Sequence, residues 1–331
     1  MPKEALFWKK LNGEVQCQLC PHYCSLKPEE LGKCRARQNR GGKLISLSYG
    51  RPCSINLDPI EKKPFYHFLP GHKTLSIATA GCNLSCSHCQ NWEISQCSPQ
   101  KMGQELEPGE VVKKALEKNA KIISYTYTEP AIFYEYMLDI AKLARKEGIK
   151  NTMVSNGFIN QKPLKKLLPY MDAANIDLKA LSDKHYKEIC GARLEPVLET
   201  IKTLKEKGVW IELTNLLIPG LNDSKENIER LVEWIKDNIG AEVPVHFSAF
   251  YPTYKMKDKR PTPIEKVERA GEIAKSNGLK FVYTGNLEEN NTACPNCGKV
   301  LIRRGGRVEK EFRRRRLTCS KCGEKIEGVW E

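Results

Sequence analysis

Cysteine is the residue type that most constrains how this chain can fold. There are fourteen cysteines among 331 residues, and eleven of them fall into three tight groups. The groups are Cys17, Cys20, Cys24 and Cys34; Cys82, Cys86 and Cys89; and Cys294, Cys297, Cys319 and Cys322. In a reducing compartment closely spaced cysteines are more often metal ligands than disulfides. The pattern therefore predicts metal sites at both ends and in the body of the chain, while Cys53, Cys97 and Cys190 stand apart.

The remaining composition favours a soluble, cytoplasmic protein. Hydrophobic residues make up 40% and charged residues 28% of the chain. No apolar run approaches the roughly 18 residues of a membrane span, which predicts no membrane association. The first residues lack the apolar stretch of a signal peptide.

The formal charge of +14 is concentrated at the two ends. Residues 1–50 carry +5, residues 291–331 carry +6, and the long middle only +3. A basic end could bind nucleic acid or an acidic protein. We favour the simpler interpretation of a solvated surface, because the surplus avoids the body of the chain.

The order of local patterns predicts an α/β protein with two appended modules. Residues 1–50 are expected to form a cysteine-rich metal-binding lobe, residues 51–288 a barrel, and residues 289–331 a zinc-ribbon-like tail. Within the barrel region, residues 51–73 look like a proline-containing connector. Strand-like and helix-like segments then alternate, which predicts a parallel sheet with right-handed crossovers. Six such units are too few for a closed eight-stranded barrel, so we expect a partial (β/α)6 barrel.

The expected strands are short runs rich in β-branched or aromatic residues. They cover 74–78, 122–127, 151–155, 174–177, 210–217 and 245–250, with a seventh near 280–283. Helices are expected from Pro108, from Pro130 to about Gly148, and over about 161–169, 183–190, 195–207, 223–238 and 263–277. Functional groups in such sheets gather at the carboxyl ends of the strands.

The central cysteines directly follow the first of these strands with the spacing Cys-x3-Cys-x2-Cys. Three thiolates on one loop can bind three irons of a 4Fe-4S cluster and leave the fourth iron open for a substrate. A zinc site completed by His88 fits less well, because His88 lies between two of the ligands. Cys97 could be a stray fourth ligand, but a lone cysteine is more often a small buried hydrophobe.

This loop resembles the signature of the radical S-adenosylmethionine (SAM) superfamily. The resemblance implies that SAM chelates the open iron, and that one electron cleaves it into methionine and a 5′-deoxyadenosyl radical, which abstracts hydrogen. It also implies an electron donor such as a flavodoxin or ferredoxin. His88 would lie beside the adenine. Thr128 and Glu129, at the end of the second strand, correspond to the run that meets the SAM amino group in pyruvate formate-lyase activating enzymes.

The next strand ends extend the resemblance to these activases. Ser155 and Asn156 end the third strand and are candidate SAM contacts. Asp177 and Lys179 end the fourth; we expect them to be catalytic, with Lys179 neutralising a carboxylate of SAM or substrate. His246, on the sixth strand, is a further candidate cofactor contact, and His185 a weaker candidate.

One position departs from the pattern of the activases. Val154 replaces an aspartate that helps to hold a monovalent cation near SAM. The resemblance therefore leaves open whether this chain has a cation site.

Over nearly its whole length the chain resembles the radical-SAM enzyme of the AmmeMemoRadiSam gene set. The shared features are the Cys-x2-Cys-Pro-His-x-Cys opening, the Asp-Pro-Ile-Glu-Lys-Lys-Pro connector at 58–64, the Tyr-Thr-x-x-Glu-Pro strand end at 125–130 and the Phe-Ser-Ala-Phe run at 247–250. The substrate that this resemblance leaves open is a partner protein, as for the activases, or a small molecule.

The two terminal cysteine groups predict further metal sites. Two Cys-x2-Cys-Gly knuckles begin at Cys294 and Cys319 and read as a zinc ribbon with a structural Zn²⁺, with a second iron–sulfur cluster as the weaker alternative. The N-terminal group, Cys17, Cys20, Cys24 and Cys34, with His22 as a spare ligand, also favours Zn²⁺, but an auxiliary iron–sulfur cluster stays open.

A different class of function is a nucleic-acid-binding zinc protein. The net charge and the arginine run at 313–316 motivate it. No stacking-aromatic motif accompanies the arginines, so binding of nucleic acid is not favoured. A radical-SAM enzyme that modifies RNA is not excluded by this objection and remains the alternative.

Overall fold

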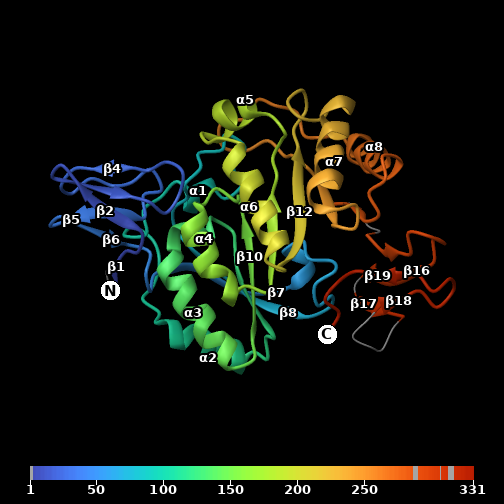
Figure 1. Ribbon diagram of the computed structural model, residues 1–331, viewed down its shortest axis with the longest axis horizontal. Coiled ribbons are helices and arrows are strands. Elements are labelled where there is room, and N and C mark those ends of the chain that lie inside the picture. Colours follow the sequence, from blue (N-terminus) through green and yellow to red (C-terminus); the bar gives the residue numbers. More distant parts are fainter. Residues whose placement is uncertain (1–2, 286–289, 306, 312–316) are drawn as a thin grey trace.

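The computed structural model describes residues 3–285, 290–305, 307–311 and 317–331 (Figure 1). Its centre is a sheet with the strand order β14-β13-β12-β11-β10-β9-β8-β7. The strands are β7 (Pro52–Pro59), β8 (Lys73–Thr79), β9 (Ile122–Tyr125), β10 (Lys150–Ser155), β11 (Ala173–Asp177), β12 (Trp210–Leu217), β13 (Val245–Ala249) and β14 (Val282–Thr284). From β8 to β14 every neighbouring pair is parallel and consecutive in sequence. This is a partial barrel, as expected.

The helices between these strands cover the outside of the sheet. They are α1 (Trp92–Ser95), α2 (Pro108–Glu117), α3 (Tyr134–Lys146), α4 (Gln161–Leu167), α5 (Asp183–His185), α6 (Glu195–Glu206), α7 (Lys225–Ile239) and α8 (Ile264–Ser276). Shorter helical turns are η1 (Ile60–Lys62), η2 (Pro130–Phe133), η3 (Leu168–Tyr170) and the π-helical turn η4 (Tyr186–Cys190). Apolar stripes on the longer helices pack onto the sheet, so the main core lies between the two layers.

The segment 51–73 differs from the expected connector. Residues Pro52–Pro59 form β7, which pairs antiparallel with β8 at the edge of the sheet. Proline lacks an N–H for a sheet ladder, but an edge strand tolerates it where that position faces away from its neighbour. The two terminal prolines of β7 concealed a strand that the sequence pattern did not reveal.

The N-terminal lobe is built from short antiparallel strands. They are β1 (Lys3–Glu4), β2 (Trp8–Leu11), β3 (Glu14–Cys17), β4 (Ser25–Leu26), β5 (Arg37–Arg40) and β6 (Lys43–Ser46), arranged as β1-β6-β5 and β2-β3-β4. Its apolar residues belong to the same continuous core as the barrel. A buried ion pair adds to this junction: the Arg37 guanidinium lies 2.6 Å from the Glu135 carboxylate of α3, and both side chains are 1% exposed.

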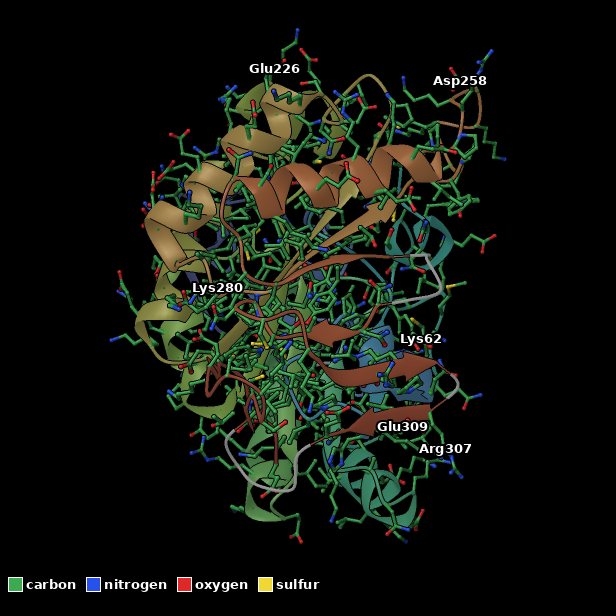
Figure 2. The ribbon with its side chains drawn as sticks, turned by 90° about the vertical axis from the view of Figure 1, so that its right-hand side faces the viewer. Lys62, Glu226, Asp258, Lys280, Arg307 and Glu309 are labelled. Carbon is green, nitrogen blue, oxygen red and sulfur yellow. The ribbon has the colours of Figure 1, made fainter. Side chains whose placement is uncertain are left out.

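The C-terminal tail lies on the other side of the barrel from the lobe (Figure 1). It contains β15 (Thr292–Ala293), β16 (Val300–Gly305), β17 (Arg307–Lys310), β18 (Leu317–Thr318) and β19 (Lys325–Ile326). Figure 2 shows the face that carries the tail, with Arg307 and Glu309 of β17 exposed. The tail has a small core of its own, which Phe281 and Tyr283 of the barrel join.

Backbone hydrogen bonds join the tail to the segment before β8. The N–H of Leu69 donates to the carbonyl of Val329, and the N–H of Val329 donates to the carbonyl of His67, both at 2.7 Å. His67 also contacts the carbonyl of Glu327 and the hydroxyl of Tyr283. No helix among the described residues is long and apolar enough to cross a membrane.

Candidate active site

A cavity of about 340 Å³ opens at the carboxyl ends of the barrel strands. Most of the residues predicted to act together line it. They are Cys82, Cys86, Cys89, His88, Thr128, Ser155, Asn156, Asp177 and Lys179. Each strand end from β8 to β11 contributes, which is the arrangement that a parallel sheet imposes on polar residues following its strands.

Hydrogen bonds hold the cysteine loop against the turn η4. The N–H of Ser85 donates to the carbonyl of Cys190, and the N–H of Ser87 donates to the carbonyl of Ile189, both at 2.9 Å. Cys190 also places its thiol against Cys86, and this hydrogen bond lowers the pKa of Cys86. Cys190 was set apart in the sequence because it follows the loop by a hundred residues, and only the fold brings them together. Single π-helical turns are frequent at functional sites.

The three thiols point into the cavity with different neighbours. The amide of Asn156 lies 3.8 Å from the Cys82 sulfur, and the hydroxyl of Ser95 lies 3.3 Å from that of Cys89. Burial raises the pKa of Cys82 and of Cys89. Thiols in this setting become thiolates when a metal binds them, because metal binding displaces the proton.

Glu129 is fully buried behind the cavity wall, and its carboxylate is occupied by the protein itself. It accepts hydrogen bonds from the N–H groups of Ala131 and Asn156 and from the Ser155 hydroxyl, at 2.8–2.9 Å. Burial raises its pKa to about 7 in spite of these donors. Glu129 therefore holds the end of β10 in position through these hydrogen bonds, and it does not line the cavity.

Asp177 and Lys179 form an ion pair at the end of β11. The ammonium of Lys179 lies 3.0 Å from the Asp177 carboxylate. Burial opposes the charge of Lys179, but Asp177 and the nearby thiols of Cys86 and Cys190 outweigh it and raise its pKa well above the ordinary value. Lys179 is therefore a fixed cation beside the cysteine loop.

His88 is buried at the same wall, and its Nδ1 has no hydrogen-bond partner among the described residues. Burial lowers its pKa to about 3, and Lys179 and His185 add to this shift. His88 is therefore neutral near pH 7. A neutral ring with a free ring nitrogen suits a flat heterocyclic ligand better than an anion.

The structure does not bring His246 to this cavity. His246 is the second residue of β13, and its Nε2 lies 2.7 Å from the Glu212 carboxylate. That carboxylate also accepts the N–H groups of Tyr66 and His67, close to where the tail meets the barrel. Ser248, two residues further along β13, faces the cavity instead. His246 lies too far from the carboxyl end of β13 to reach the cavity, whereas Ser248 lies closer to that end.

Sequence reasoning did not assign roles to several other residues of the cavity. Lys63 is 2% exposed, pairs with Asp58 at 3.0 Å and lies over the ring of Tyr127. The Tyr127 hydroxyl donates to Asp58 at 2.6 Å. Asn91 donates to the carbonyl of Tyr127, which fixes that residue in a left-handed conformation with φ of 65°. In the sequence, the adjacent lysines Lys62 and Lys63 of the connector are the feature that could have indicated these residues of the cavity.

The tail cysteines converge closely. The Sγ atoms of Cys294, Cys297, Cys319 and Cys322 all lie within 4.8 Å of one another. Burial opposes ionisation of Cys319, but N–H donors of Lys321 and Cys322 outweigh it and lower its pKa to about 6. Four converging sulfurs, one of them readily ionised, fit a single metal ion.

The comparisons with known proteins agree with this geometry. The sequence profile described as the radical SAM superfamily matches residues 76–235, which include the cysteine loop. An uncharacterized protein of Methanocaldococcus jannaschii is 46% identical over 99% of both chains. The chain belongs to the radical SAM superfamily.

More distant relatives place it near the activating enzymes of this superfamily. The pyruvate formate-lyase-activating enzyme of Clostridium pasteurianum is 27% identical over 60% of this chain and 87% of its own. A radical SAM methyltransferase structure from Sphaerobacter thermophilus shares the fold with a TM-score of 0.53 and 19% identity, covering 66% of this chain and 67% of that one. The chain is thus a radical-SAM enzyme that resembles the activating enzymes.

Proposed function

We propose that the cavity binds SAM against a 4Fe-4S cluster held by Cys82, Cys86 and Cys89, and that the chain uses SAM to abstract hydrogen from a protein or small-molecule substrate. The supporting observation is the meeting of three thiols from one loop with polar strand ends in one cavity. The three sulfurs are not gathered around one point as the tail sulfurs are, which suits ligands that each bind a different iron.

A cluster held by Cys82, Cys86 and Cys89 would supply an open iron for SAM and the electron for its reductive cleavage. The protein's own residues then orient and enclose SAM. Thr128 donates its hydroxyl proton to the carbonyl of Thr79, so the oxygen is left to accept from the SAM amino group. Lys179 would neutralise the carboxylate of SAM or of the substrate, and its ion pair with Asp177 holds the ammonium group in place.

The remaining predicted residues complete the SAM site. His88 would lie along the adenine, and Ser155 and Asn156 would contact the ribose side. Glu129 acts through these two, because it binds the Ser155 hydroxyl and the Asn156 N–H. A one-electron donor of the flavodoxin or ferredoxin type supplies the reducing equivalent.

The relatives support a protein as the substrate. Several are named as activating enzymes, of pyruvate formate-lyase, 4-hydroxyphenylacetate decarboxylase and benzylsuccinate synthase, and each name states another enzyme as the target. A small molecule is the second option. The arginine run at 313–316, on which the nucleic-acid hypothesis depends, lies outside the described residues.

We further propose a structural Zn²⁺ for Cys294, Cys297, Cys319 and Cys322. Two pairs of sulfurs lie 3.5 Å apart. A tetrahedral zinc with Zn–S bonds of about 2.3 Å places its sulfurs roughly 3.8 Å apart. The spacing of the tail sulfurs agrees with that geometry.

Anaerobic reconstitution tests the proposed function. The protein is supplied with iron, sulfide, dithionite and SAM, and 5′-deoxyadenosine is measured by chromatography. We expect product from the unmodified chain and from Cys97→Ala, and none from Cys86→Ala. Absence of 5′-deoxyadenosine from unmodified protein that carries its cluster would contradict the proposal.

A further inference from the structure

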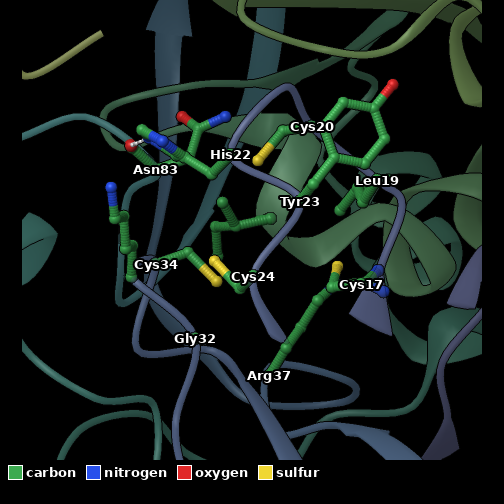
Figure 3. A pocket seen from close by; sticks show the side chains of 12 residues that line it. Cys17, Leu19, Cys20, His22, Tyr23, Cys24, Gly32, Cys34, Arg37 and Asn83 are labelled. Carbon is green, nitrogen blue, oxygen red and sulfur yellow. Dashed lines mark hydrogen bonds between the residues drawn. The ribbon is translucent and has the colours of Figure 1, made fainter. Parts of the chain in front are cut away.

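The active-site cavity has much more room than the cavity between the cysteines of the N-terminal lobe. The lobe cavity has about 10 Å³, close to the smallest space that holds one water molecule (Figure 3). The active-site cavity has about 340 Å³ and extends to residues that the proposed SAM site does not use. Among these are Lys62 and Lys63, the lysine pair, and Tyr127. These residues are therefore candidates for contact with the substrate.

The lysine pair lies far from the cysteine loop along β8. It follows β7, and Asp58 near the end of β7 pairs with Thr74 near the start of β8, whereas the cysteine loop follows the end of β8. A strand rises about 3.3 Å per residue, so the backbone from Thr74 to Thr79 covers roughly 16 Å. Lys179 lies beside the thiols of the cysteine loop. The lysine pair is thus a second cationic site in the same cavity.

One carboxylate serves both ammonium groups of the lysine pair. The Oδ1 of Asp58 lies 3.1 Å from the Nζ of Lys62, and its Oδ2 lies 3.0 Å from the Nζ of Lys63. Burial opposes the charge of Asp58, but the Tyr127 hydroxyl and the two lysines outweigh it and hold the pKa of Asp58 well below its usual range. The group therefore carries two positive charges against one negative charge.

The ammonium group of Lys63 is buried and only partly satisfied. Its side chain is 3% exposed, and Asp58 is its one ion-pair partner among the described residues. The ring of Tyr127 covers another side, with its centroid 4.0 Å from the Nζ. Burial lowers the pKa of Lys63 in spite of Asp58. Because an ammonium group has three N–H donors, Lys63 has a donor left for a ligand in the cavity.

Tyr127 is held in a backbone conformation that costs energy for a residue with a Cβ. Its φ is 65°, in the left-handed region. Its hydroxyl donates to Asp58 at 2.6 Å and accepts from the Asn56 amide at 3.3 Å, and its carbonyl accepts from Asn91 at 2.7 Å. Strained residues persist where their surroundings fix them, and they are common at ligand sites. Tyr127 is therefore a positioning residue, which holds Asp58 and covers Lys63.

A carboxylate is the ligand that best matches this group. One carboxylate neutralises the surplus of one positive charge, whereas a phosphate group brings nearly two negative charges. Val154 and Leu216 line the same cavity and offer apolar contact to the carbon chain of an acid. SAM has a single carboxylate, and Lys179 beside the cysteine loop is placed to neutralise it. The lysine pair is left for a different molecule.

We propose that Lys62 and Lys63 bind a carboxylate of the substrate in the active-site cavity. The place of this carboxylate in the reaction rests on the proposed function; its binding to the two lysines does not. It belongs to a free organic acid or to a carboxylate side chain of a partner protein. Lys62 is 63% exposed on the face that carries the tail, so a ligand can reach it from solvent (Figure 2).

Saturation-transfer NMR on the holoenzyme tests this binding. The protein carries its oxidised cluster and saturating SAM, and no reductant is added. The probes are butyrate, for a free acid, and N-acetylglutamate methylamide, for a protein side chain. Butyramide and the glutamine analogue are the matched uncharged controls.

We expect at least one acid to bind in the millimolar range, and its amide to bind about tenfold more weakly or less. Binding of butyrate alone indicates a free acid as the source, and binding of the glutamate probe alone indicates a protein side chain. Equal affinity for acid and amide, or binding of neither acid, would overturn the proposal.

Variants of the lysine pair locate the bound acid. Lys63→Met should weaken acid binding by about tenfold or more, because it removes a buried charge. Lys62→Met should weaken it by about threefold, because that charge is exposed. Lys162→Met, on the exposed side of α4, is the matched control and should bind the acid as the unmodified chain does.

Unchanged acid binding in folded Lys63→Met would make its ion pair with Asp58 purely structural and would overturn the proposal. Circular dichroism checks that the variant folds. If it does not, Lys62→Met decides, because its exposed side chain does not support the core. Unchanged binding in Lys62→Met would then overturn the proposal.

A separate measurement of SAM cleavage keeps the two proposals apart. We expect the unmodified chain and Lys162→Met to form 5′-deoxyadenosine equally with dithionite. No product from unmodified protein that carries its cluster would refute the proposed function, while the comparison of acid and amide still tests the lysine pair. Normal cleavage without any preference for the acid would refute the carboxylate site alone.

Discussion

The lobe and the tail each carry four cysteines, yet they are attached to the barrel in opposite ways. The lobe shares the main hydrophobic core, is held by the buried Arg37–Glu135 pair and touches the loop of Cys82. The tail has a separate small core and joins the barrel through the segment 66–69, on the side away from the lobe. Two groups of four cysteines therefore lie in different surroundings: one is packed against the loop of Cys82, and the other lies in a short chain end with its own core.

Among the variants that test how the lobe is attached to the barrel, we expect the largest effect from disrupting the buried ion pair of Arg37 and Glu135. Arg37→Ala leaves Glu135 charged and unpaired in the core, which should cost about 3–5 kcal/mol of the free energy of unfolding. Denaturant unfolding followed by circular dichroism measures it. The double variant Arg37→Met/Glu135→Leu is the control, and we expect it to recover most of the loss, because no charge is left buried. A loss in the double variant as large as in the single one would contradict this explanation.

The second largest loss of stability is expected from a substitution at Gly81, where the lobe lies close to the cysteine loop. Gly81→Ala introduces a methyl group against the Cys34 carbonyl at a φ of 103°. Gly13→Ala is the matched control, since its φ is 81° and nothing lies within 4 Å of the new methyl group. Both should lose about 1 kcal/mol to backbone strain, and Gly81→Ala about 1–3 kcal/mol more through the clash. Equal losses in unfolding experiments would show that the lobe does not press on the loop.

A pH change should loosen the tail before the lobe. Burial lowers the pKa of His67 to about 4, while the unfolded value is about 6.5. His67 is thus neutral when folded, and its contribution is present above pH 6.5 and lost as the pH falls toward 4. Between pH 7 and 5.5 the loss is about 1.2 kcal/mol.

Hydrogen exchange at the Leu69 and Val329 amides reports this change, because these amides join the tail to the barrel. His67→Asn removes the titrating group and is the control, in which the dependence on pH should flatten. An unchanged slope in the variant would assign the effect to another group.

The smallest effect is expected from loss of the tail metal. Cys319→Ala should release zinc and speed hydrogen exchange over β16, because binding and folding are coupled in such sites. SAM cleavage should stay within about twofold of the unmodified rate, because the tail contributes no residue to the cavity among those described. A large loss of cleavage, with the barrel still folded, would contradict the separation of the two sites.

Much of the architecture could be predicted from the sequence, because buried parallel strands are short apolar runs with helices between them. The parallel strands from β8 to β13 lie within one or two residues of their expected ranges, and the seventh was anticipated. The edge strand β7 was missed since its prolines resemble those of a loop. The sequence also does not show how far along a strand a residue lies, so His246 was expected to contact the cofactor although it lies near Glu212.

Contacts between distant segments were the other limit. Nothing near Cys190 in the sequence indicates that it lies against Cys86, because η4 places it there. A cysteine pattern gives the number of ligands in the lobe but not the separation of their sulfurs, so zinc at that site stays a prediction. Glu129 looked like a ligand contact until its three internal donors were known.

Anomalous X-ray diffraction from anaerobically grown crystals, recorded at the iron and zinc absorption edges, tests the central comparison most directly. The account predicts an iron cluster at Cys82, Cys86 and Cys89, and one zinc ion in the tail. No iron beside Cys82, or iron in place of zinc in the tail, would contradict it.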